Sequence, residues 1–97
     1  MSTFIILSSF TEQGVRAIKD TTKRADKFKD MSKQHGATVK DLYWTLGQYD
    51  VVAIIEAPDV TSVTALGLSL GMAGNVRTQT MRAFTATEMT GILGKMA

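Results

Sequence analysis

The 97-residue chain has no cysteine, one proline and one histidine, and each scarcity excludes a kind of structure or site. Without cysteine there is no disulfide, no thiolate metal ligand and no cysteine nucleophile. A single histidine, His35, and scattered acids leave no recognisable spacing of metal ligands, so we expect no bound metal. The lack of cysteine also fits a reducing cytoplasm, which is the location that we expect.

The chain also lacks a long apolar run and a large excess of positive or negative charge. The first apolar run, FIIL at residues 4–7, is too short for a signal peptide or a membrane span and has no basic segment before it. The net charge is only +2, and the basic residues between positions 16 and 33 are interleaved with acids. Mixed signs are typical of a solvated helix face, so we expect neither a membrane nor nucleic acid as a partner.

Hydrophobic periodicity and turn residues divide the chain into alternating strands and helices. We expect strands at 3–10, 37–46, 51–57 and 76–85, where β-branched and aromatic residues cluster. We expect helices at 12–34 and 60–72, where apolar residues recur at helical spacing, and a short tail helix after a Thr85–Glu88 capping box. The order βαββαβ is the split pattern of a ferredoxin-like α+β domain, which we expect to fill residues 1–97 as a single domain.

Two local patterns predict which side chains face the core. The helix at 12–34 should present one apolar stripe, formed by Val15, Ile18, Ala25, Phe28 and Met31. The strand at 37–46 alternates, with Lys40, Leu42, Trp44 and Leu46 on one face and Val39, Asp41, Tyr43 and Thr45 on the other.

The composition of the strands predicts their order in the sheet. The first and third carry the apolar runs FIIL and VVAII, whereas the second and fourth carry charged residues. Buried central strands and polar edges favour a four-stranded antiparallel sheet in the order 4-1-3-2, with both main helices on one face. Central strands that are apolar on both faces need to be covered on the second face too, and a second copy of the same sheet is the simplest cover. The helix at 60–72 is uncharged, which also favours self-association into a homodimer or a higher homo-oligomer.

Two stretches, YWTLGQYDVVAIIEAPD at 43–59 and LSLGMAGNVRTQTMRAF at 68–84, resemble the GYD domain family of small bacterial proteins. Gly47, Tyr49 and Asp50 match the turn for which the family is named. The resemblance covers nearly the whole chain and implies a dimeric α+β barrel, in which two ferredoxin-like sheets pack face to face. The family has no assigned biochemical role, so the resemblance leaves the function open.

The turn that carries the family motif is the first candidate site. As a hairpin closure it is fully explained if Gly47 supplies a positive φ and Asp50 bonds its own backbone two residues further on. Alternatively, Tyr49 and Asp50 form a donor and an acceptor at the mouth of a pocket, because sites are often built on loops. Trp44, just before the turn, is a further candidate, although such residues more often cover a core.

Glu56 is the second candidate, because it directly follows five apolar residues. A buried carboxylate needs a partner, and we expect Arg77 or Arg82 of the last strand to provide it. The pair is either a structural ion pair or the polar element of a ligand pocket, where Glu56 would suit a general base.

Two classes of function remain open at this point. The first is a small-molecule binding module or a structural oligomer without catalysis. The alternative is a cofactor-free enzyme acting on a hydrophobic or aromatic compound, by analogy with monooxygenases and isomerases of the same barrel group. No phosphate-binding loop or dinucleotide fingerprint is visible, so we expect no cofactor. Convergence of Tyr49, Glu56 and Arg77 or Arg82 on one enclosed cavity would favour the enzyme.

Overall fold

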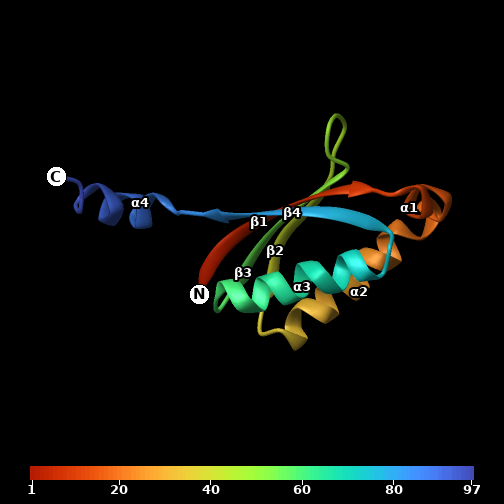
Figure 1. The fold of residues 1–97 in the computed structure, drawn as a ribbon, viewed down its shortest axis with the longest axis horizontal. Coiled ribbons are helices and arrows are strands. Elements are labelled where there is room, and N and C mark those ends of the chain that lie inside the picture. The colour runs from red at the N-terminus through yellow and green to blue at the C-terminus, as the bar shows by residue number, and fades with distance from the viewer.

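In the computed structural model, which describes all of residues 1–97, a four-stranded sheet is covered by helices on one face only (Figure 1). The strands are β1 (Ser2–Phe10), β2 (Thr38–Trp44), β3 (Val51–Ala57) and β4 (Val76–Ala83). Their order is β2-β3-β1-β4, and every neighbouring pair is antiparallel. This is the predicted 4-1-3-2 order read from the opposite edge, so the α+β class and the sheet topology are confirmed.

The helical elements are α1 (Glu12–Arg16), the 3₁₀ turn η1 (Ile18–Asp20), α2 (Thr21–Gln34), α3 (Val60–Met72) and α4 (Ala86–Leu93). The N-cap of α3 is Asp59, whose carboxylate accepts a hydrogen bond from the Ser62 backbone N–H at 2.8 Å. Thr85 and Glu88 form the predicted capping box of α4. Local capping chemistry therefore sets where both of these helices begin.

The segment 12–34 is not the single helix that its apolar spacing predicts. Thr11 caps α1 by accepting a hydrogen bond from the Gly14 N–H at 3.1 Å, but α1 ends at Arg16 and η1 turns the chain before α2 begins. The Arg24 guanidinium of α2 donates to the carbonyl oxygens of Ala17 at 2.6 Å and Gly14 at 3.3 Å. These bonds satisfy carbonyls that a continuous helix would have used internally.

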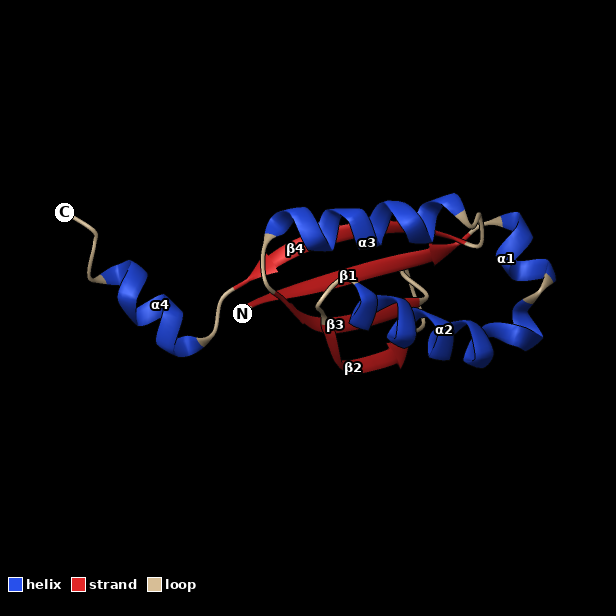
Figure 2. Ribbon diagram, turned by 90° about the horizontal axis from the view of Figure 1, so that it is seen from below, coloured by secondary structure: helices blue, strands red, loops and turns tan.

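Long-range contacts hold α1 away from the axis of α2. The Thr11 hydroxyl donates to the Gly74 carbonyl at 2.5 Å, and the Thr11 N–H donates to the Asn75 carbonyl at 3.1 Å. The Gln13 amide donates to the Ala73 carbonyl and to the Asn75 side chain, both at 3.0 Å. The first helical turn is thereby fastened to the loop between α3 and β4, beyond the end of the sheet (Figure 2).

The break changes which residues of segment 12–34 reach the core. Val15 and Ile18 are exposed, because α1 and η1 lie beyond the sheet rather than on it. Phe28 is buried and Met31 packs against the core, as predicted. The predicted apolar stripe is therefore correct for the second half of the segment and wrong for the first.

The alternation expected in β2 is interrupted by a β-bulge. The register with β3 shifts between Val39 and Asp41, which leaves Lys40 as an extra residue. The bulge turns Val39 to the same side as Leu42, and both pack against the core. The sequence pattern had placed these two residues on opposite faces.

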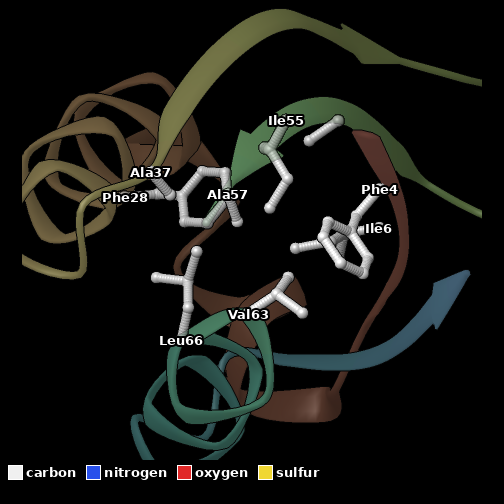
Figure 3. Packing of buried hydrophobic residues seen from close by; sticks show 9 residues of the cluster. Phe4, Ile6, Phe28, Ala37, Ile55, Ala57, Val63 and Leu66 are labelled. Carbon is white, nitrogen blue, oxygen red and sulfur yellow. The ribbon is translucent and has the colours of Figure 1, made fainter. Parts of the chain in front are cut away.

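The core lies between the covered face of the sheet and the helices α2 and α3. Figure 3 shows the side chains from the two helices and the central strands pointing toward one another. Its buried hydrophobic members are Phe4, Ile6, Phe28, Ala37, Ala53, Ile55, Ala57, Val63 and Leu66. Burial of large apolar side chains such as these, at about 1.5–3 kcal/mol each, holds the helices on the sheet.

The other face of the sheet carries no helix (Figure 1). Alternate residues of each strand point to it, and we call it the open face. Its apolar residues are Ile5 and Leu7 of β1, Val52 and Ile54 of β3, Tyr43 of β2 and Met81 of β4. All of them are partly or largely exposed in the single chain.

The short helix α4 lies apart from the body of the molecule, at the end of β4 (Figures 1 and 2). None of its residues is buried. The apolar residues of this tail, which we call the tail stripe, are between 38 and 69% exposed: Met89, Ile92, Leu93 and Met96. The tail therefore adds to the length of the molecule, which is 51 Å, without covering any of its apolar surface.

Replacing Gly14 with Ala tests the fastening of α1. A Cβ atom at Gly14 would lie 2.1 Å from the Asn75 backbone oxygen, so α1 or the loop must move. We expect Gly14→Ala to lower the free energy of unfolding by more than about 1 kcal/mol, measured by urea denaturation. The control is Gly71→Ala in α3, where a Cβ meets nothing within 4 Å and should leave stability unchanged or raise it. Equal effects of the two substitutions would contradict the close contact.

Candidate functional site

The candidate residues predicted from the sequence are scattered over the molecule. Tyr49 and Asp50 lie in the turn between β2 and β3, Trp44 ends β2 on the covered side, Glu56 and Arg77 lie on the open face, and Arg82 lies on the covered face. The structure therefore does not bring them together in one pocket.

The turn with the Gly-x-Tyr-Asp motif anchors the hairpin to the central strand β1. Gly47 has a φ of 105°, in the left-handed region that favours glycine, as expected. The Asp50 carboxylate accepts a hydrogen bond from the Phe10 N–H at 2.8 Å, and the Asp50 N–H donates to the Ser8 carbonyl at 2.8 Å. The expectation that Asp50 bonds its own backbone two residues on is therefore wrong, because its side chain continues the β1–β3 ladder instead.

Tyr49 extends the same turn to the other edge of the sheet. Its hydroxyl donates to the Gln79 side-chain oxygen of β4 at 2.8 Å. Gln79 is paired with Leu7 of β1, so Tyr49 reaches across the central strand at one end of the open face. The Thr45 hydroxyl, in turn, donates to the Tyr49 carbonyl at 2.7 Å and steadies the turn. Both polar groups of the motif are thus occupied by contacts within the chain.

Glu56 forms an ion pair with neither arginine in the chain, which corrects the predicted pair. It lies beside Thr3 on the open face, whereas Arg77 lies beside Ser9, six residues further along β1. Glu56 takes part in neither of the two ion pairs of the chain. It is only half-buried, so water can solvate its charge, and the carboxylate needs no ion-pair partner.

Arg82 has a different acidic partner, in the tail. Its guanidinium lies 2.8 Å from the Glu88 carboxylate and 4.5 Å from the centre of the Phe84 ring. The hydrogen bond from Arg82, followed by that from the Thr85 N–H, holds the pKa of Glu88 below its usual range. Because the folded-state pKa is lowered, this contribution to stability is present at neutral pH and is lost as the pH falls through that pKa. Arg82 therefore fixes the first turn of α4 at the end of the sheet.

A cavity of about 650 Å³, which the sequence does not predict, lies between the sheet and the helices. Its walls are mainly apolar, and its floor is formed by the covered faces of β1 and β3. Trp44 is the only one of the six candidates that lines it. Ala17 and Asp20, in the segment where the chain turns between α1 and α2, line one end of it. No feature of the sequence signals it, because its walls come from segments far apart in the chain.

The structure contains neither a helix that could span a membrane nor a cluster of metal-binding side chains. No helix is long and apolar enough to cross a membrane. No three His, Asp or Glu side chains gather in a group that could hold a metal ion.

The architecture defines a small α+β protein with a helix-covered antiparallel sheet and a motif-bearing hairpin turn. The chain belongs to the GYD domain family, whose model matches residues 4–93. A relative from Thermus thermophilus, the glutamine synthetase and cystathionine beta-lyase binding protein, is 31% identical over 90 residues, which cover 92% of this chain and 95% of the relative. The confirmed resemblance thus extends along nearly the entire chain.

Two solved structures share the fold. The crystal structure of FFRP-DM1 matches with a TM-score of 0.63 and 20% identity, and the match covers 87% of this chain and 100% of that one. The crystal structure of TTHA0845, also from Thermus thermophilus, matches with a TM-score of 0.57 and 24% identity, over 89% of this chain and 96% of that one. At these identities the likeness concerns the fold alone.

Removing the Asp50 carboxylate tests its structural role. We expect Asp50→Ala to lower the free energy of unfolding by about 1–3 kcal/mol, because the Phe10 N–H loses its acceptor, and Asp50→Asn to cost less. Urea denaturation measures both. Asp26→Ala, on the exposed side of α2, is the control and should change stability by less than about 0.5 kcal/mol. An Asp50→Ala protein as stable as the control would show that the carboxylate serves something other than the fold.

Proposed function

We propose that this protein is a non-catalytic binding module that acts as a homodimer, or as a larger homo-oligomer, and binds an enzyme. The observation that carries the proposal is the outer face of α3, an exposed and uncharged surface on the side of the sheet away from the open face. The name of the relative, a binding protein for glutamine synthetase and cystathionine beta-lyase, supports the choice of an enzyme as partner. A cytoplasmic location is part of the proposal, in keeping with the absence of cysteine.

Self-association is proposed through the open face. Its apolar residues on β1 and β3 lie at the centre of the sheet, where a monomer would present a contiguous apolar patch to water. A second copy packed face to face removes both patches from water at once, as in a sheet-on-sheet sandwich. The half-buried Glu56 lies at the margin of this surface, where a partly solvated carboxylate is tolerated.

The tail supports the same assembly. An isolated helix of eight residues is marginal in water, and the tail stripe finds no cover in its own chain. The Arg82–Glu88 pair directs α4 outward from the end of β4, where the surface of a second copy can receive it. We therefore propose that the tail stripe packs on the partner subunit.

The outer face of α3 is the proposed enzyme-binding surface. Its inner face is occupied, because Val63 and Leu66 are buried in the core. On the outer face, Leu68 and Met72 are 71 and 88% exposed, and no charged residue occurs between positions 60 and 76. A helix with two exposed apolar side chains one turn apart and no charge is typical of a docking surface rather than of a solvated helix. Because α3 and the open face lie on opposite sides of the sheet, a dimer leaves it accessible (Figure 1).

The geometry gives less support to the alternative of a cofactor-free enzyme. Catalysis by the predicted residues would require Tyr49, Glu56 and an arginine around one reacting group. Tyr49 instead binds Gln79, and Arg82 binds Glu88. The arrangement therefore favours binding over the chemistry first considered.

Light scattering tests the homodimer. At micromolar concentration we expect the mass of a dimer or of a multiple of it. Ile54→Asp should give a folded monomer by circular dichroism or should unfold, because an unpaired charge at a buried interface costs several kcal/mol. Truncation after Phe84 should lower the melting temperature or change the mass. Thr22→Asp, on the exposed side of α2, is the control and should alter neither. A monomeric wild-type protein would contradict the proposal.

Binding to a purified enzyme tests the α3 surface. We expect saturable binding to glutamine synthetase or cystathionine beta-lyase from the same organism, measured by surface plasmon resonance. Leu68→Asp with Met72→Asp should weaken it at least about tenfold, because both charges would be desolvated. Thr22→Asp with Gln34→Asp in α2 is the matched control. If the α3 variant lowers the mass of the homo-oligomer instead, this face is a contact between copies and the enzyme-binding surface lies elsewhere.

A further inference from the structure

The cavity between the sheet and the helices has the size and lining of a small-molecule site. Its volume of about 650 Å³ lies within the usual range of about 300–1,000 Å³ for such sites. Apolar side chains from α2, α3 and the covered face of the sheet line most of it, among them Phe10, Phe28, Leu42 and Leu70. It lies on the covered side of the sheet, so neither the open face nor the outer face of α3 takes part in it.

A serine hydroxyl that bonds to no other group of the protein opens into the floor of this cavity. Ser8 of β1 is only 8% exposed and points to the covered side, beside Val51 and Thr78. Its hydroxyl forms none of the side-chain hydrogen bonds of the chain, whereas the hydroxyl of the other buried serine, Ser32, donates to the Phe28 carbonyl at 2.8 Å. No fully enclosed side-chain polar atom lacks a partner, so the Ser8 hydroxyl must open into the cavity.

The rim of the cavity is positively charged. Lys23 and Lys27 lie one helical turn apart on α2, and both line the cavity. Neither takes part in an ion pair. The third cation, Arg24, is already bound to backbone carbonyl groups, and Asp20 is the one acid among the lining residues. Two free ammonium groups above an apolar cavity favour an anionic ligand group at the rim.

Trp44 closes the side of the cavity at the edge of the sheet. Its indole N–H donates to the Thr21 hydroxyl at 3.0 Å, which joins the end of β2 to the first turn of α2. The indole ring thus forms a wall beside the two lysines, and it is the only tryptophan of the chain. Because it is the only tryptophan, a ligand in this cavity is expected to change its fluorescence.

We propose that this cavity binds a small amphipathic acid. The carboxylate of the ligand lies at Lys23 and Lys27, its apolar body lies against the walls, and a polar atom at its buried end bonds the Ser8 hydroxyl. This chemistry follows from one cationic rim, one apolar interior and one hydroxyl on the cavity floor that bonds to no protein group. The site goes beyond the proposed enzyme binding and does not depend on it.

Three flexible ten-carbon probes test the proposal, measured by Trp44 fluorescence and by calorimetry below their micelle concentrations. We expect 10-hydroxydecanoate to bind saturably to the wild-type protein and to shift the Trp44 emission. Decanoate, which has no terminal hydroxyl, should bind about 3- to 10-fold more weakly, the effect of one hydrogen bond. Decylamine, which carries a cation in place of the carboxylate, should not saturate. Comparable binding of decylamine, or saturable binding by neither acid, would overturn the proposal.

Paired variants assign the two ends of the site. Ser8→Ala should abolish the preference for 10-hydroxydecanoate while leaving decanoate binding within about twofold of wild type. Lys23→Glu with Lys27→Glu should weaken both acids at least about tenfold, because attraction becomes repulsion. Lys19→Glu with Lys33→Glu, outside the cavity, changes the net charge equally and should leave binding intact. If both double variants behave alike, the lysines of the rim do not form the site.

These measurements need no enzyme partner and no change in oligomeric state. A protein that fails to bind the acids but still binds its enzyme through α3 would overturn the cavity proposal alone. A protein that binds the acids but does not bind an enzyme through α3 would overturn the proposed function and leave the cavity as a ligand site.

Discussion

The sheet of this protein is apolar on both faces, yet one chain supplies helices for only one of them. On β1 and β3, alternate residues enter the core with α2 and α3, and the residues between them stay on the open face. The remaining helix, α4, does not cover that face, because it leaves the body at the end of β4. The cavity lies on the covered side, and the outer face of α3 stays accessible when the open face is packed against a second copy, as proposed.

The family motif fixes how the two central strands, β1 and β3, pair with each other. The Asp50 carboxylate and the Asp50 N–H hold the end of β1, and Tyr49 passes over that strand to β4. The hairpin of β2 and β3 is thereby set in register against β1, so that alternate residues fall on the intended faces. Through its bonds to the backbone of β1, the turn residue Asp50 thus has the effect of an additional hydrogen-bonded residue pair in the sheet.

The features that could be predicted from the sequence are those that depend only on residues close together in the chain. The strand VVAIIEA, the helix from Val60 to Met72 and the Thr85–Glu88 capping box follow from local periodicity and capping. The break after α1 was not predictable, because it depends on bonds from Thr11 and Gln13 to a loop about sixty residues away. The partner of Glu56 was mistaken for a related reason. A sequence shows that a carboxylate follows an apolar run, but its distance from the arginines of β4 is set by the registers in which β1 pairs with β3 and with β4.

Because α4 is separate from the sheet, it folds under different constraints from the rest of the chain. A helix of eight residues with no cover from its own chain gains little from the folding of the rest. Its capping box and the Arg82–Glu88 contact prepare its first turn, but the remaining turns need apolar surface from outside. In the proposed dimer, the sheet and its two main helices can therefore fold within one chain, whereas the last dozen residues complete their structure in a step that is second order in protein concentration.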